Sequence, residues 1–127
     1  MLSKVKKIIK QAIKLRRKLK GKTDFVSVEE YLNSIGYKVI LFNTPVGDAE
    51  LERYCLVEKA QKTKAFTYCA TAKIVFIDND ISPEDKTYAL YHELGHIEVG
   101  HLDYKRMSTI NKLLMEIQAD AFACALL

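Results

Sequence analysis

The sequence predicts an α+β fold, in which helices pack on a short, mostly antiparallel sheet. Several segments place apolar residues at helical spacing between helix start and stop signals. Two β-prone runs, at residues 65–69 and 73–77, are close enough to form an antiparallel hairpin. The chain has 127 residues, of which 49% are hydrophobic, so a single domain can bury a core without disulfide bonds.

The first segment is predicted to be a basic amphipathic helix. Residues 1–22 hold ten of the twenty Lys and Arg residues and no acidic residue, which gives +10 against −6 for the rest of the chain. Apolar residues recur at helical spacing between residues 3 and 20, and Gly21 is expected to end the helix. Without aromatic anchors or a base-reading motif, packing of the apolar stripe on the domain is favoured. Binding of this helix to a membrane surface, to a nucleic acid or to an acidic partner remains an alternative.

The next elements are predicted to be a short helix and a strand. A capping box that starts at Ser27 opens the helix, and Gly36 closes it. Residues 37–42 are apolar and β-prone, and the turn-forming residues 43–45 end this strand. Residues 48–60 are ambiguous between a helix and a helix followed by a strand.

Two helices are predicted in the last third of the chain. Ser82 and Pro83, followed by two acidic residues, form a strong helix start, and this helix should end near Gly100. Ser108 is expected to cap a last helix that runs to the end of the chain. On that helix, aliphatic residues at helical spacing predict the core-facing stripe: Ile110, Leu113, Leu114, Ile117 and Ala121.

The strongest functional signal is an H-E-x-x-H motif at residues 92–96. Residues four apart on a helix point from one face, so His92 and His96 can share a metal ion. Glu93 lies beside them, where it can take a proton from a metal-bound water. The third histidine of the chain, His101, is also nearby. The motif therefore predicts a zinc peptidase site and not two solvated histidines.

A third protein ligand is expected, because a catalytic zinc ion has three protein ligands and an open position for water. Leu102 occupies the position at which a further histidine would follow in one common extended motif. The better candidate is Glu116, which shares the edge of the last helix with Asp120. Two carboxylates four residues apart repel each other, and a dication or an imidazolium between two helices would reverse that effect.

These two motifs, at residues 92–101 and 116–123, resemble those of the ImmA/IrrE family of gluzincin-type metallopeptidases. The resemblance covers residues 87–127. It implies a zincin-like domain at residues 23–127, preceded by the basic helix of residues 1–22 within a single overall domain. Family members are expected to continue beyond the point in the last helix where this chain stops.

The resemblance also implies a set of residue roles. The zinc ion, Zn2+, would be bound by His92, His96 and Glu116, with Glu93 as the general base. Asp120 would hold a ligand imidazole in its binding tautomer without binding the metal. One strand of the hairpin would present its edge to an extended substrate.

The oxyanion of the reaction needs a donor besides zinc, and the candidates are His101, Tyr104, Tyr88 and Tyr91. Members of the family occur in bacteria, phages and mobile elements, typically beside a helix-turn-helix repressor that they cleave. The resemblance therefore implies a zinc-dependent endopeptidase whose protein substrate is such a repressor.

Two alternatives remain open at this point. In the first, the chain is a nucleic-acid-binding module with a structural metal site closed by a fourth protein ligand, and residues 1–22 contact nucleic acid weakly. In the second, it is a regulatory protein that keeps zinc but does not cut, against which the intact Glu93 counts. An odd number of widely spaced cysteines, with no signal peptide or membrane span, predicts free thiols and a cytoplasmic location.

Overall fold

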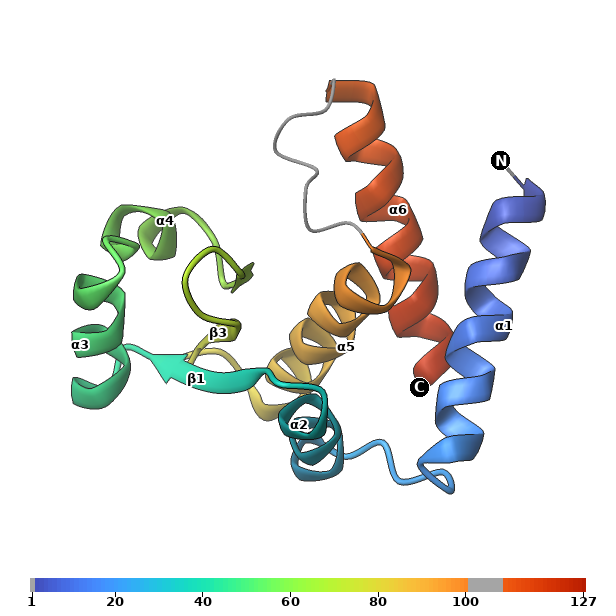
Figure 1. Ribbon diagram of the computed structural model, residues 1–127, viewed down its shortest axis with the longest axis horizontal. Coiled ribbons are helices and arrows are strands. Elements are labelled where there is room, and N and C mark those ends of the chain that lie inside the picture. The colour runs from blue at the N-terminus through green and yellow to red at the C-terminus, as the bar shows by residue number, and fades with distance from the viewer. Residues whose placement is uncertain (1, 101–108) are drawn as a thin grey trace.

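The computed structural model describes residues 2–100 and 109–127. In these residues, helices surround a small three-stranded sheet (Figure 1). The elements, in chain order, are α1 (Leu2–Lys18), α2 (Phe25–Ser34), β1 (Lys38–Phe42), α3 (Pro45–Arg53), α4 (Val57–Lys62), β2 (Ala65–Tyr68), β3 (Ile74–Asp78), α5 (Pro83–Val99) and α6 (Thr109–Leu126). The predicted α+β class is confirmed.

The sheet has the order β1-β3-β2, with β3 in the centre and buried along its whole length. The predicted antiparallel hairpin of β2 and β3 is present, with Ala65 opposite Ile77. Strand β1 pairs with β3 in parallel, with Lys38 opposite Ile74, so the sheet is mixed and one of its two strand pairs is antiparallel. Parallel pairing needs a crossover, and residues 48–60 supply part of it as helices α3 and α4.

Helix α2 begins earlier than its capping box predicts. Asp24 is the N-cap, and its carboxylate accepts a hydrogen bond of 3.3 Å from the backbone N–H of Ser27. The Ser27 hydroxyl in turn donates to the same carboxylate, at 2.6 Å. The prediction that Ser27 caps this helix is therefore wrong, because Asp24 reaches the free N–H groups of the first turn from one turn earlier. Gly36, with φ +95°, ends the helix as predicted.

Helix α5 has the predicted start and end. The Ser82 hydroxyl oxygen accepts the backbone N–H of Asp85 at 3.1 Å, and Pro83 occupies the first turn. Gly100 adopts φ +84°, a conformation that a side chain would strain, and its N–H donates to the carbonyl of His96. These local contacts set the length of the helix that carries the H-E-x-x-H motif.

Helices α5 and α6 approach each other closely at Gly95. A Cβ atom at this position would lie 3.1 Å from the carbonyl oxygen of Ala119 and 3.2 Å from the Cβ of Phe122. Glycine on one helix and alanine on the other thus allow the two backbones to come near enough for their side chains to share one site.

The face that α6 buries differs from the predicted one. Ile110, Leu113 and Ile117 are 72%, 61% and 40% exposed, so the predicted stripe is wrong for these three residues. The fully buried residues lie on another side of the helix: Ala119, Phe122, Ala123 and Leu126. Apolar residues occur on both sides of α6, and the positions of its neighbours α1 and α5 select which side is buried.

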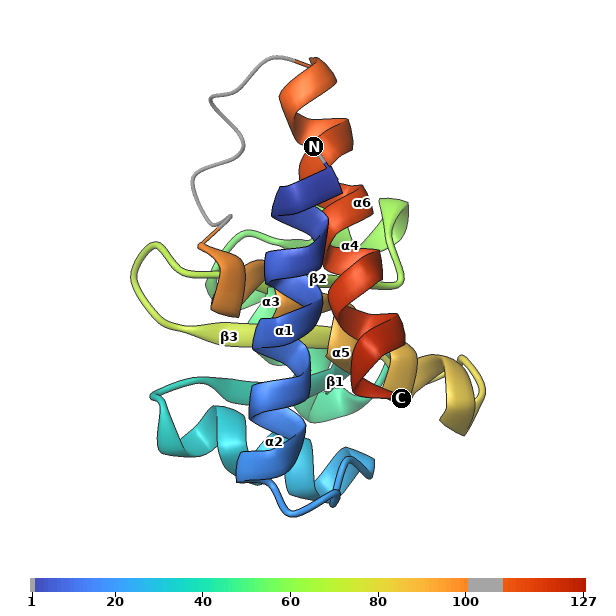
Figure 2. The same cartoon turned by 90° about the vertical axis from the view of Figure 1, so that its right-hand side faces the viewer.

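Helix α1 is part of the core. Ile8, Ala12 and Leu15 are buried in the same cluster as residues of α5 and α6, whereas Ile13 is 40% exposed. Helices α1 and α6 lie side by side in both views (Figures 1 and 2). The packing of the first helix on the domain is thus the arrangement that the structure shows. Within the described ranges, none of the helices has the combination of length and apolarity that a bilayer crossing requires.

Candidate metal centre

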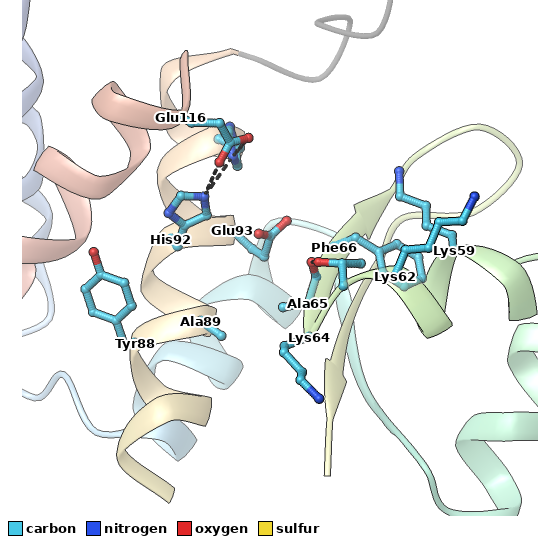
Figure 3. Close-up of a pocket in the computed structure, with 12 residues that line it drawn as sticks. Lys59, Lys62, Lys64, Ala65, Phe66, Tyr88, Ala89, His92, Glu93 and Glu116 are labelled. Carbon is cyan, nitrogen blue, oxygen red and sulfur yellow. Dashed lines mark hydrogen bonds and ion pairs between the residues drawn. The ribbon is translucent and has the colours of Figure 1, made fainter. Parts of the chain in front are cut away.

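The structure brings the three predicted ligands together from two helices. His92 and His96 lie one turn apart on α5. Glu116, on α6, faces His92 (Figure 3). The Nε2 atom of His92 is 2.8 Å from Oε2 of Glu116, and Nε2 of His96 is 3.2 Å from Oε1. The two Nε2 atoms are themselves 3.2 Å apart.

This arrangement fits a zinc ion. Ligand atoms about 2.0–2.1 Å from a tetrahedral zinc are roughly 3.3 Å from one another, close to the 3.2 Å between the two Nε2 atoms. Each Nε2 atom also lies near a different oxygen of Glu116, at 2.8 Å and 3.2 Å. Two imidazoles and one carboxylate are also the ligands of a catalytic zinc site that keeps one position for water. Within residues 2–100 and 109–127, His92, His96 and Glu116 form the one group of candidate metal ligands, with all ligand atoms within 4.8 Å of one another.

The charges around the site favour a cation. Burial disfavours protonation of His92, but its hydrogen bond to Glu116 and the nearby charges of Glu93, Glu116 and Asp120 outweigh burial and raise its pKa. The hydrogen bonds from His92 and His96 hold the pKa of Glu116 well below its usual range. The carboxylates around His92 thus favour positive charge at this point, and a divalent cation would supply it.

Asp120 lies outside the three converging ligand atoms. Its Oδ1 atom is 2.8 Å from Nδ1 of His92, the ring nitrogen that points away from Glu116. The hydroxyl of Tyr88 donates to the same carboxylate oxygen at 3.1 Å. A carboxylate in this position can accept the Nδ1–H of His92, which leaves the Nε2 lone pair free for a metal.

Glu93 is buried beside the ligands, with 7% of its surface exposed. The hydroxyl of Thr67, on β2, donates a hydrogen bond of 2.8 Å to its Oε1 atom. Burial raises the pKa of Glu93, although the neighbouring His96 and the Thr67 hydrogen bond oppose the shift. The role of Thr67 could not be predicted from the sequence: the residue lies in a predicted strand, but nothing in the sequence indicates that its side chain faces α5.

Of the four candidate oxyanion donors, the structure describes Tyr88 and Tyr91. Tyr88 lines the pocket beside the metal ligands, where its hydroxyl is bound to Asp120. Tyr91 is buried and its hydroxyl donates to the carbonyl of Thr23, so the prediction for Tyr91 is wrong. His101 and Tyr104 lie outside the described residues.

A pocket of about 560 Å³ opens in front of the candidate metal ligands. One wall is formed by α5 and α6, and the opposite wall by α4 and β2, with Ala65 and Phe66 on β2 (Figure 3). Three lysines belong to this second wall: Lys59, Lys62 and Lys64. Strand β2 is at the edge of the sheet, whereas β3 has a partner on both sides. Of the two hairpin strands, β2 is therefore the one with an edge available for a further strand.

Comparison with known proteins connects this geometry to a family. Residues 51–127 match the family Peptidase_M78, described as the IrrE N-terminal-like domain. Searches among curated proteins and among solved structures found no significant match. The family match spans more than half of the chain and contains all the candidate metal ligands as well as Glu93 and Thr67. The chain therefore belongs to the ImmA/IrrE family of metallopeptidases.

Proposed function

We propose that the chain is a zinc-dependent endopeptidase. His92, His96 and Glu116 hold the zinc ion, and Glu93 is the general base. The observation that carries this proposal is the convergence of three ligand atoms within 4.8 Å, next to a buried carboxylate. Membership in a metallopeptidase family supports the same reaction class.

When bound at this site, zinc would polarise the scissile carbonyl and lower the pKa of a water toward neutrality. Glu93 accepts the proton of the attacking water and passes it to the departing amine. Burial raises the pKa of Glu93, which brings this carboxyl group closer to the pH at which it must both accept and donate a proton. Thr67 engages Oε1, so Oε2 is the atom that exchanges the proton.

An extended substrate would bind along the free edge of β2. Main-chain hydrogen bonds to an edge strand hold a peptide in an extended form. In this position the peptide passes between the lysine-lined wall and Glu93, and its scissile carbonyl can approach the three ligands. Tyr88 lines the same pocket and is the candidate oxyanion donor on α5, a role that requires its hydroxyl to turn away from Asp120, to which it donates in the structure.

The substrate that we propose is a helix-turn-helix repressor encoded by the same phage or mobile element. Its support is the family, whose members typically lie beside such a repressor and cleave it. We also propose a cytoplasmic location, which the three free and exposed thiols of Cys55, Cys69 and Cys124 support.

Co-expression with the helix-turn-helix protein encoded next to this chain tests the proposal. The wild type should shorten the repressor on a gel, and Glu93→Gln should leave it intact while binding as much zinc by elemental analysis. The amide keeps the shape of the side chain but cannot take the proton, which should cost about 10²–10⁴-fold in rate.

Three results separate the parts of this proposal. If Glu93→Gln cleaves at the wild-type rate, Glu93 is not the base. If His96→Ala retains a full equivalent of zinc, the ligand assignment is wrong. An intact repressor beside zinc-loaded wild type would exclude that substrate.

A further inference from the structure

Helix α1 has two opposite faces with different roles. Its buried face contains Ile8, Ala12 and Leu15, which are 2%, 0% and 7% exposed. At 100° per residue, five exposed cationic side chains project from the opposite side of the helix. We call these residues the cationic stripe: Lys6, Lys7, Lys10, Lys14 and Arg17. The stripe extends about 16 Å along the helix axis, at 1.5 Å per residue.

The positive charges of the cationic stripe are not neutralised by ion pairs among the described residues. In the described part of the chain, none of the ion pairs involves a residue of the stripe. Lys10 has a lysine four residues before it and another four residues after it, and like charges at this spacing destabilise a helix by about 0.2–0.5 kcal/mol per pair. The first turn also lacks an acidic residue to complement the helix dipole. An anionic ligand along the stripe would relieve this repulsion.

The buried face argues against a membrane as that ligand. A helix that lies on a bilayer inserts its apolar face between the lipids. In α1 this face is packed against α6, within the same core cluster that contains residues of α5, and is not available. Helix α1 also contains no aromatic residue that could anchor it at a lipid interface.

The charge pattern fits the phosphate backbone of a duplex. Double-stranded DNA carries about one negative charge per 1.7 Å of its axis, so a stripe about 16 Å long faces several phosphates. Lysine and arginine side chains are among the groups that contact phosphates, and phosphate contacts carry no sequence information. The ligand chemistry is therefore a regular polyanion, bound without preference for sequence.

We propose that the cationic stripe of α1 is a binding site for double-stranded DNA. It is separate from the metal centre, because no residue of α1 lines the pocket in front of Glu93. The site does not depend on the proposed peptidase activity. If both exist, DNA binding would raise the local concentration of the enzyme around substrates that are themselves bound to DNA.

Fluorescence anisotropy of the full chain with a labelled duplex of about 20 base pairs tests this proposal, at salt concentrations between about 50 and 200 mM. If four phosphates are contacted, the logarithm of the binding constant should fall with the logarithm of salt with a slope of about −3.6. The variant that combines Lys6→Gln, Lys10→Gln and Lys14→Gln should bind at least about tenfold more weakly, with a slope smaller by about 2.7. Glutamine has nearly the helix propensity of lysine, so α1 should remain folded.

The matched control combines Lys38→Gln, Lys62→Gln and Lys73→Gln, three exposed lysines outside α1. This variant has the same net charge as the stripe variant and should bind the duplex like the wild type. Equal losses in the two variants would show that overall charge, and not α1, attracts DNA. Circular dichroism checks folding, and if the triple variant is unfolded, Lys10→Gln alone should still reduce the slope by about 0.9.

Two further outcomes would overturn the proposal. One is a wild type that does not bind the duplex at about 50 mM salt, the condition that most favours phosphate contacts. The other is a wild type that binds vesicles with phosphatidylserine more tightly than the duplex, which would assign the stripe to a membrane surface.

Discussion

Replacement of Gly95 by alanine should push α5 and α6 apart and weaken the metal centre. The new Cβ atom would lie 3.1 Å from the carbonyl oxygen of Ala119 and 3.2 Å from both the Cα of Ala119 and the Cβ of Phe122. Two of these three atoms belong to the backbone, so no side-chain rotation can relieve the contact. Helix α6 must therefore move by a few tenths of an ångström, and it carries Glu116 one turn away.

Two opposing effects set the size of the stability change. Overpacking of a close interface costs about 1–3 kcal/mol. Alanine is favoured over glycine inside a helix by about 1 kcal/mol, which offsets part of that cost. The net loss should be about 1 kcal/mol, or about 4 °C in melting temperature for a chain of this length. Zinc affinity should fall by about tenfold, the lower end of the range for residues that orient metal ligands.

The assay combines thermal unfolding in EDTA with a zinc titration against a chromogenic chelator. Ala121→Gly is the control, because it lies on α6, away from the contact with Gly95, and costs about 1 kcal/mol in helix propensity alone. It should match the lower melting temperature of Gly95→Ala but keep wild-type zinc affinity. If Gly95→Ala melts at or above the wild-type temperature and binds zinc equally well, close approach of the helices is not what assembles the site.

Three other changes test separate parts of the structure. Asp120→Asn should weaken zinc binding by about 10–100-fold, and Glu116→Gln, which alters a ligand, should weaken it further; the reverse order in chelator competition would exchange their roles. Thr67→Val should lower the turnover number by about 10–100-fold with little change in KM, because it removes a hydrogen bond to Glu93 worth about 1.5–3 kcal/mol. Thr67→Ser should restore most of the rate. Equal rates for the serine and valine variants would exclude a role of the Thr67 hydroxyl in turnover. Burial opposes ionisation of Asp78, but hydrogen bonds from a backbone N–H, an amide and an ammonium group outweigh it and lower its pKa. Asp78 therefore stabilises the fold above its ordinary pKa of 3.8, and this contribution is lost as the pH falls through the lower folded-state value. In the Asp78→Asn variant the melting temperature should accordingly fall less steeply with decreasing pH than in the wild type. The same acid dependence in both proteins would contradict this.

The helix that carries the candidate site could be predicted because its determinants are local. Ser82 and Gly100 are the caps in the structure, as the sequence predicts. The spacing of His92 and His96 places both on one face of any helix, whatever surrounds it. The motif identifies Glu116 and Asp120, but their distances to the histidines depend on how closely α6 approaches α5.

The N-cap of α2 and the pairing of β1 show where local sequence signals are not sufficient to predict the structure. Both Asp24 and Ser27 are good N-cap residues, and the structure uses the earlier one. The hairpin of β2 and β3 follows from a short turn, whereas the parallel pairing of β1 depends on the path of α3 and α4. Parallel strands meet only after a long crossover, so neighbouring residues carry little information about the pairing.

The sequence alone is sufficient to predict helix α5 with both of its caps, the two facing histidines and the resemblance to a peptidase family. Ser108, the expected cap of the last helix, lies outside the described residues. The tertiary structure selects which side of α6 is buried, because Leu113 and Phe122 are both apolar and helical periodicity cannot distinguish between them. It also decided that Thr67 meets Glu93, a contact between a strand and a helix 26 residues apart. Such contacts depend on how elements pack against one another, and that packing is a property of the whole chain and not of any one segment.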